Sequence, residues 1–287
     1  MSKIETRHGS LNWEVIVAPG LPLVSDELPP GAKQRIFSPI SATLIFGERD
    51  AILVDALLTI DQAASLVNWI AKRGKNLTTI YATHGHGDHF FGVGAVLERF
   101  PNAHCVARPE VIKKMRQQTS PQTLHERWKA RFPGQIPGRL VIAEELTGNT
   151  IELEGHELVS LPLGHTDTDN TTCLHVPSVG LVVAGDAAYN GVHLLLAESN
   201  SQTRREWIAA LDTIEALNPT AVIAGHKRAE NDDSPRILEE TRQYIRDFDR
   251  LAETTTTAQE LYGEMLRLYP NLINPGALWS SARGVKA

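Results

Sequence analysis

Apolar and polar positions along the chain fall into two similar blocks of strand and helix periodicity. In the first block, apolar runs at 42–46 and 51–54 flank a four-residue turn and predict a hairpin. The second of these strands is almost wholly apolar, which indicates burial on both faces. A capping-box pattern at 59–62 followed by apolar residues at helical spacing predicts a helix. A buried strand at 79–83 and a second helix at about 92–100 complete the block.

The second block repeats this order. Apolar runs at 172–176 and 180–184, separated by a Pro-Ser turn, predict another hairpin. A helix with a capping box at 203–206 follows, and then a strand at 221–224. Helices that alternate with buried strands predict an α/β fold, here with two packed sheets and the helices outside them.

Each block also places one acid and one histidine at corresponding strand ends. Asp55 follows the hairpin of the first block and His84 follows its last strand, whereas Asp186 and His226 occupy the same places in the second block. Ligands bind at the carboxyl ends of strands in open α/β sheets. We therefore expect these side chains to meet along one edge.

Composition narrows the class of protein. The chain has 287 residues and a formal net charge of −6, with no run of Lys and Arg, which argues against nucleic-acid binding. No apolar stretch is long enough to cross a bilayer, and residues 1–20 lack the pattern of a signal peptide. Cys105 and Cys173 lie in apolar runs and are interpreted as core residues. We expect a cytoplasmic protein that acts without membrane or nucleic acid.

The chemistry is concentrated in the loop 83–89, which reads Thr-His-Gly-His-Gly-Asp-His. Three imidazoles and a carboxylate within six positions are the ligands that hold zinc and similar divalent metals. The spacing predicts that His84 and His86 point to one metal and Asp88 and His89 to another. The loop lies between a predicted strand and a predicted helix, which is the context that such a motif requires.

Four motifs in this order resemble the metallo-β-lactamase superfamily. They are the H-x-H-x-D-H loop, Gly164-His165-Thr166, Ala184-Gly185-Asp186 and Ala224-Gly225-His226. The resemblance covers about residues 41–226 and implies a four-layer αββα sandwich, followed here by a C-terminal helical extension.

The resemblance also implies a dinuclear centre and the ligands that hold it. In this reading Asp186 bridges two zinc ions, and Asp55 supports the metal loop from behind. The first metal is held by His84, His86 and His165, and the second by Asp88, His89 and His226. Iron or a mixture of divalent metals is the alternative to zinc.

The expected chemistry is hydrolysis of a small-molecule carbonyl substrate by a metal-bridging hydroxide, with Asp88 as the catalytic residue that moves the proton. The substrate is a lactone, lactam, ester or thioester. Alternatives are a glyoxalase-II-like thioesterase, a mononuclear-iron persulfide dioxygenase and, third, a β-lactamase-like activity. Zinc and hydrolysis are favoured because His86 stands where di-iron oxygen reductases of similar motif have Glu.

The remaining substrate contacts are expected from the flanking segments. Residues 1–40 are interpreted as a segment packed on the catalytic domain, 41–232, which contains an insertion at about 111–140. The insertion forms either a helical lid over the pocket or a helix pair on the surface. Candidate substrate contacts are Tyr189 and His193 after the bridging acid, Phe90 and Phe91 as an apolar wall, and Trp128 in the insertion.

Residues 233–287 are predicted to be mainly helical. Ser234-Pro235 reads as a helix start, and the box at 257–260 starts a second helix. Their apolar stripes either cover one sheet of the same chain or form a homodimer contact. The tail from Leu272 is either docked or partly disordered.

Overall fold

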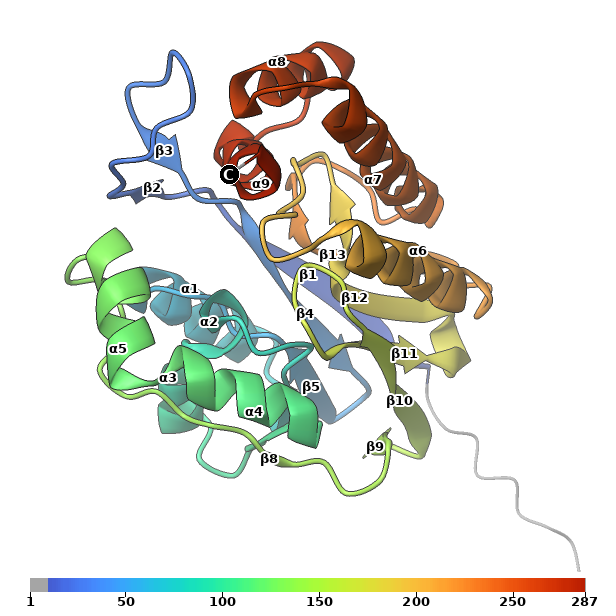
Figure 1. Cartoon of the computed structure of the whole chain (residues 1–287). Coiled ribbons are helices and arrows are strands. Elements are labelled where there is room, and N and C mark those ends of the chain that lie inside the picture. The colour runs from blue at the N-terminus through green and yellow to red at the C-terminus, as the bar shows by residue number, and fades with distance from the viewer. Residues whose placement is uncertain (1–9, 287) are drawn as a thin grey trace, which may run out of the picture.

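The apolar runs form two sheets that pack face to face in the computed structural model, which describes residues 10–286 (Figure 1). The first sheet has the strand order β1-β4-β5-β6-β7-β8. Its strands are β1 (Asn12–Ala18), β4 (Ile40–Phe46), β5 (Asp50–Val54), β6 (Asn76–Tyr81), β7 (His104–Ala107) and β8 (Glu144–Glu145). The second sheet has the order β13-β12-β11-β10-β9. It comprises β9 (Thr150–Leu153), β10 (His156–Gly164), β11 (Thr171–Val176), β12 (Leu181–Asn190) and β13 (Ala221–Lys227).

The two sheets share a pairing pattern, as the sequence blocks predicted. In the first sheet β4 pairs with β5 antiparallel and β5 with β6 parallel, whereas in the second β11 pairs with β12 antiparallel and β12 with β13 parallel. The predicted end of β12 at 184 was too early, because the strand continues through Asp186 and pairs Tyr189 with His226. Asp55 and His84 follow the carboxyl ends of β5 and β6, His226 lies near the end of β13, and Asp186 lies in the middle of β12.

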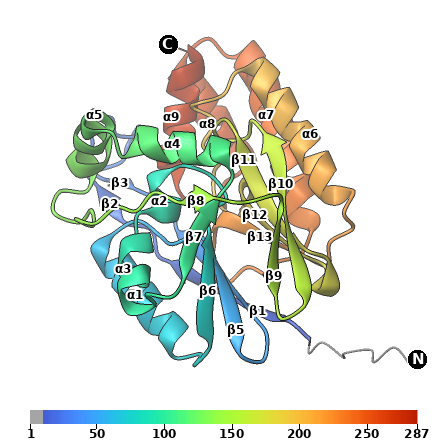
Figure 2. The ribbon, with the colours of Figure 1, turned by 90° about the horizontal axis from the view of Figure 1, so that it is seen from below.

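Helices cover the outer face of each sheet, which completes the αββα sandwich (Figure 2). The first sheet is covered by α1 (Ile60–Ala71), α3 (Val93–Arg99) and α4 (Pro109–Gln118). The second is covered by α6 (Ser201–Glu215), α7 (Arg236–Thr254), α8 (Ala258–Leu268) and α9 (Pro275–Lys286). A third apolar cluster lies between the sheets, with Ile52 and Val54 from one and Val183 and Ile223 from the other. The predicted fold class is confirmed.

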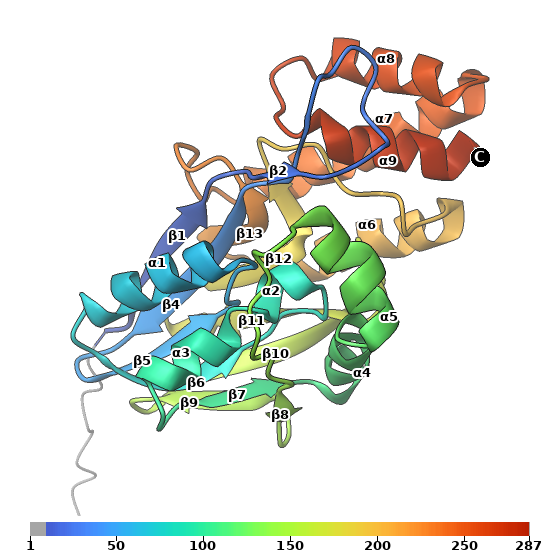
Figure 3. The same ribbon diagram turned by 90° about the vertical axis from the view of Figure 1, so that its left-hand side faces the viewer.

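The N-terminal segment contains more regular structure than predicted. Strand β1 is an edge strand whose residues are mostly half-buried, and it was not predicted. The segment 21–30 was interpreted as irregular, but Pro22–Leu23 (β2) pairs antiparallel with Arg35–Ile36 (β3). The loop between them arches beside α8 and α9 (Figure 3), where Glu27 forms an ion pair with Arg283 of α9 at 2.6 Å. Residues 1–9 of the predicted N-terminal segment lie outside the described residues.

Two of the three predicted capping boxes are present. The Thr59 hydroxyl accepts from the Gln62 amide at the start of α1, and Thr257 and Glu260 form the same arrangement at α8. The box predicted at 203–206 is wrong, because α6 begins earlier. Its cap is Asn200. The Asn200 side-chain oxygen accepts from the backbone N–H of Thr203, and the Thr203 hydroxyl accepts from the backbone N–H of Asn200. A local Asn–Thr pair thus replaces the expected Thr–Glu pair.

The insertion consists of α4, the short α5 (Pro121–Thr123) and a π-helical turn, Leu124–Lys129. After β13, α7 begins at Arg236 with Pro235 rather than Ser234 at its cap position. The apolar stripes of α7 and α8 pack on the second sheet of the same chain, and the tail docks as α9. A homodimer contact through these helices stays a prediction. Cys105 and Cys173 are buried and free, as expected. Across residues 10–286, no helix has the length and apolar character needed to span a bilayer.

Candidate metal centre

Asp55 follows β5 and holds the loop 83–89 in place by hydrogen bonds. Its side chain is buried, with 2% exposed. One carboxylate oxygen of Asp55 accepts from the Thr83 amide at 2.9 Å, and the other accepts from the Thr83 hydroxyl at 2.9 Å. The second oxygen also lies 2.8 Å from His89 Nδ1. The backbone of Asp55 has a φ of 62°, a left-handed conformation that Asp tolerates better than most residues. Asp55 therefore lies where the resemblance placed a supporting acid.

Hydrogen bonds to the Nδ1 atoms set the tautomers of three imidazoles. His226 Nδ1 lies 2.7 Å from the Pro39 carbonyl, which only accepts, so Nδ1 carries the proton. His89 Nδ1 donates in the same way to Asp55. The Thr83 hydroxyl donates its proton to Asp55 and so accepts from His84 Nδ1 at 3.1 Å. In its neutral form each ring thereby presents an Nε2 lone pair to a metal.

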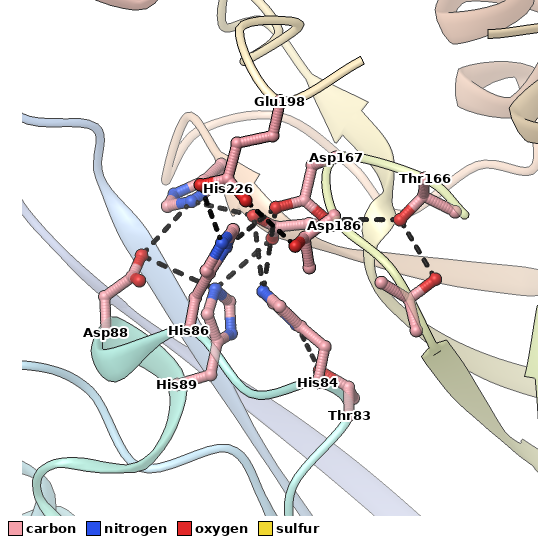
Figure 4. A network of polar contacts seen from close by, with 12 residues as sticks. Thr83, His84, His86, Asp88, His89, Thr166, Asp167, Asp186, Glu198 and His226 are labelled. Carbon is pink, nitrogen blue, oxygen red and sulfur yellow. Dashed lines mark hydrogen bonds and ion pairs between the residues drawn. The ribbon is translucent and has the colours of Figure 1, made fainter. Parts of the chain in front are cut away.

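The imidazole rings and three carboxylates converge into two clusters (Figure 4). In each cluster one ligand atom per residue lies within 4.8 Å of the others. The first cluster contains His84, His86, Asp167 and Asp186, and the second contains Asp88, His89 and His226. Asp186 contacts both, because its oxygens lie 3.8 Å from His84 Nε2, 3.3 Å from His89 Nε2 and 3.1 Å from His226 Nε2. The arrangement fits two divalent cations that share Asp186.

Close packing below Asp186 depends on a glycine. A Cβ on Gly225 of β13 would lie 2.1 Å from Asp186 Oδ1 and 3.0 Å from His89 Cε1. The Ala224-Gly225-His226 sequence therefore lets the parallel strand approach the shared carboxylate without a side chain between them.

Buried atoms without partners support a metal at these clusters. The Nε2 atoms of His84 and His89 and one oxygen of Asp186 are buried without a hydrogen bond among the described residues, whereas His86 contacts Asp167 at 2.9 Å and Glu198 at 3.3 Å. Such groups are costly to bury unless something binds them. Imidazole nitrogens and carboxylate oxygens are donors that suit zinc and other borderline divalent ions. The residues present therefore fit a dinuclear metal site.

The pKa values of the clustered side chains also differ from their usual values. Burial, together with the adjacent His89 ring, lowers the pKa of His84 to about 4. Burial alone would lower the pKa of His226, but Asp186 and Asp88 raise it to about 10. Burial alone would raise the pKa of Asp88, and the rings of His89 and His226 nevertheless hold it below its usual value. Without a cation the carboxylates therefore retain protons on neighbouring rings, and a metal that binds must displace them.

The structure does not bring His165 into either cluster. Strand β10 ends at Gly164, whose φ is 74°, and a tight turn follows in which the Thr166 amide donates to the Thr168 carbonyl. This turn carries Asp167 to the first cluster, 2.9 Å from His86 Nδ1. His165 instead pairs with Asp169 at 2.7 Å, and its buried Nε2 has no hydrogen-bond partner among the described residues. Asp167 was missed, although an acid two residues after the histidine was a visible signal.

A cavity of about 270 Å³ adjoins the clusters, and Asp88, Asp186 and His226 line it. Of the predicted substrate contacts, Tyr189, His193 and Trp128 line this cavity. The Tyr189 hydroxyl donates to Asp186 at 3.2 Å. Phe90 and Phe91 do not line it, because both are fully buried in the core beside the first sheet, where Phe91 packs against Trp128. Phe90 and Phe91 therefore belong to the core and do not form the predicted apolar wall of the cavity.

Glu198 is a site residue that the sequence did not indicate. It follows β12 in a loop, lines the cavity and lies 3.3 Å from His86 Nε2. Lys114 and Arg127 of the insertion contact its carboxylate at 3.1 Å each, and Thr168 donates to it at 3.0 Å. Glu198 therefore connects the insertion to the metal loop. No motif surrounds it, so only the fold reveals this role.

Comparisons with known proteins agree with this geometry. The family model described as the metallo-beta-lactamase superfamily matches residues 35–226. A metallo-beta-lactamase family protein from Thermus thermophilus has a TM-score of 0.63 at 19% identity, and the alignment covers 95% of this chain and 91% of that one. A metallo-beta-lactamase from Pontibacter korlensis has a TM-score of 0.57 at 14% identity, with 81% and 99% covered. At these identities the likeness shows the fold alone.

One curated relative is similar over a shorter segment. Hydroxyacylglutathione hydrolase 1 of Vibrio vulnificus is 35% identical over 60 residues, which are 21% of this chain and 23% of that protein. The matched segment is therefore about a quarter of the relative's length.

Proposed function

Because the chain belongs to the metallo-beta-lactamase superfamily, we propose that it is a zinc-dependent hydrolase of a small-molecule carbonyl substrate. The substrate class is a lactone, lactam, ester or thioester. The observation that carries the proposal is the convergence of two His/Asp clusters on one small cavity, with Asp186 in contact with both. Metal-dependent hydrolysis is the chemistry that such a pair of sites supports best.

The residues of the two clusters would hold two divalent ions. Such ions would supply a water that is acidic enough to ionise near neutral pH and a Lewis acid for the substrate carbonyl. Zinc is proposed because all seven clustered side chains offer imidazole nitrogen or carboxylate oxygen.

The protein's own residues hold and move the proton. Asp88 lines the cavity beside His89 and His226, where its carboxylate can take the proton of the attacking water and pass it to the leaving group. Burial and the nearby Asp186 raise the pKa of Tyr189 well above its usual value, so the phenol stays protonated. We propose that, once the Asp186 oxygen to which this phenol now donates binds a metal, the phenol donates its hydrogen bond to the substrate carbonyl instead and stabilises the developing oxyanion.

Thioesters are the first class to test among the four. The supporting observation is the 60-residue similarity to a hydroxyacylglutathione hydrolase. The cavity, at about 270 Å³, is slightly smaller than the roughly 300–1,000 Å³ of typical ligand pockets, which favours small substrates.

The test combines metal analysis with a substrate panel. Protein purified without added metal should contain about two zinc per chain and hydrolyse at least one member of a panel of lactones, lactams, thioesters and aryl esters. Chelation should abolish the activity and zinc should restore it. The variant Asp186→Asn should lose activity, whereas Asp61→Asn, which changes an exposed acid outside both clusters, should keep it. One iron per chain with oxygen consumption, or hydrolysis that survives chelation, would contradict the proposal.

A further inference from the structure

The cavity beside the metal clusters has a basic wall that hydrolysis itself does not require. Three arginines line it, namely Arg35 after the N-terminal hairpin loop and Arg127 and Arg131 in the insertion. Arg127 lies within the π-helical turn 124–129, which also presents Trp128 to the cavity, and Arg131 follows that turn. Such wide turns occur often at functional sites.

Among the described residues, two of these arginines form no ion pair with a carboxylate. Arg127 forms an ion pair with Glu198 at 3.1 Å. The Arg35 guanidinium is held by neutral groups, which are the carbonyls of Glu27 and Gly276 and the Ser280 hydroxyl. The Arg131 guanidinium has neither a hydrogen bond nor an ion pair among residues 10–286. Arg131 is therefore charged, partly buried and free to bind a ligand.

Nearby Glu27 and Glu198 offset the charge of Arg131 only in part. Asp88 and Asp186 belong to the metal clusters, and Glu198 is shared by Lys114, Arg127 and His86. Burial, and then the charges of Arg127 and Arg35, lower the pKa of Arg131 to about 10, so it stays protonated at neutral pH. An anion in the cavity would relieve this repulsion.

A second unsatisfied donor lies in the same cavity. His193 is fully buried, and its Nε2 has no hydrogen-bond partner among the described residues. Its Nδ1 lies 3.0 Å from the buried Tyr244 hydroxyl. The hydroxyl proton has no other acceptor among the described residues, so the hydroxyl donates to Nδ1. Because burial keeps the ring neutral, with a pKa lowered to about 4, its single proton is on Nε2. His193 thus offers an N–H to an acceptor in the cavity.

We propose that this site selects a small carbonyl substrate that carries a carboxylate, which Arg131 binds while His193 donates to an acceptor oxygen of the same molecule. This inference rests on the proposed hydrolase function. A carboxylate matches the planar guanidinium, which can form two parallel hydrogen bonds to it. The small cavity holds one such group beside the reacting carbonyl. The reaction that supplies the substrate must therefore leave a free acid on an activated acyl compound.

The experiment compares a charged substrate with its neutral twin. The probes are the mono-thioester of succinic acid with N-acetylcysteamine and the methyl ester of that compound, assayed on the holoenzyme by thiol release. Wild type should prefer the acid. Arg131→Gln should lower kcat/KM for the acid about ten- to a hundredfold, mainly through KM, and should affect the methyl ester much less. Arg131→Lys should recover part of the loss.

The matched control is Arg116→Gln, which removes an exposed arginine from α4 of the same insertion and should leave both substrates unchanged. An equal fall for acid and methyl ester would show that Arg131 is only structural. No fall for the acid would overturn the inference as well. Thermal melting of each variant verifies folding, and Arg131→Met replaces Arg131→Gln if the latter does not fold.

A binding measurement separates this inference from the proposed function. Calorimetry with the corresponding succinic acid mono-amide, which carries the same carboxylate but resists hydrolysis, should show at least tenfold tighter binding to wild type than to Arg131→Gln. If neither thioester is hydrolysed, hydrolysis of these thioesters fails while the binding result still decides the role of Arg131. Equal binding to both proteins would overturn that role.

Discussion

Replacing Asp55 by Asn should weaken metal binding although Asp55 itself belongs to neither cluster. The substitution keeps the shape of the side chain and tolerates the positive φ of this position. The side-chain oxygen of the new Asn can still accept from the backbone N–H of Thr83. The NH₂ group then replaces the oxygen that accepted from the Thr83 hydroxyl and His89 Nδ1, at 2.9 and 2.8 Å. Two donors would face each other at His89.

His89 escapes this conflict only by moving its proton to Nε2, the atom that belongs to the second cluster. A hydrogen bond to a charged group contributes ~1.5–3 kcal/mol, so the loss corresponds to about ten- to a hundredfold weaker metal binding. The effect should be larger at the second cluster than at the first, because His84 is affected only through Thr83.

The assay is a titration of metal-free protein with zinc against a chelating dye of known affinity. Asp50→Asn is the matched control, since it makes the same change at the opposite end of the same strand, where Asp50 accepts from Asn76. Circular dichroism should show that both variants are folded. Zinc affinities of Asp55→Asn within twofold of wild type would refute the assignment of the imidazole tautomers.

Four other substitutions test individual residues of the site. Asp167→Asn should reduce zinc bound at the first cluster, whereas His165→Gln should leave it largely intact; equal metal loss in both would restore His165 as a ligand. Tyr189→Phe should lower kcat without changing metal content, and unchanged kinetics would remove the phenol from the mechanism. In metal-free protein, the unfolding free energy of His193→Gln should fall less steeply than that of wild type as the pH is lowered. The folded pKa of His193, about 4, lies below its unfolded value of roughly 6.5, so its contribution is complete above pH 6.5 and decreases as the pH falls toward 4, by up to about 3 kcal/mol. A difference in unfolding free energy that does not change with pH would contradict this.

The features of the fold that depend on local pattern were predictable. The hairpin of β4 and β5 and the Thr59–Gln62 capping box involve residues close in sequence, so periodicity and residue type indicated them. The repeated order of acid and histidine also predicted that Asp186 and His226 would meet the first loop. Strand β1 was missed because an edge strand whose residues are mostly half-buried gives a weak signal.

The parts of the site that depend on distant segments were not predictable. The turn after Gly164 decides whether His165 or Asp167 enters the first cluster, and a shift of two residues is too fine for a motif to specify. Glu198 acquires its role only because the insertion places Lys114 and Arg127 against it. Such contacts are set by tertiary packing rather than by spacing along the chain.

The most direct test of the account is anomalous diffraction at the zinc edge from crystals of the zinc-loaded protein. Two peaks are predicted, one among His84, His86, Asp167 and Asp186 and the other among Asp88, His89 and His226, with Asp186 in contact with both. A single peak, or peaks away from these side chains, would contradict the dinuclear centre on which the proposed hydrolysis depends.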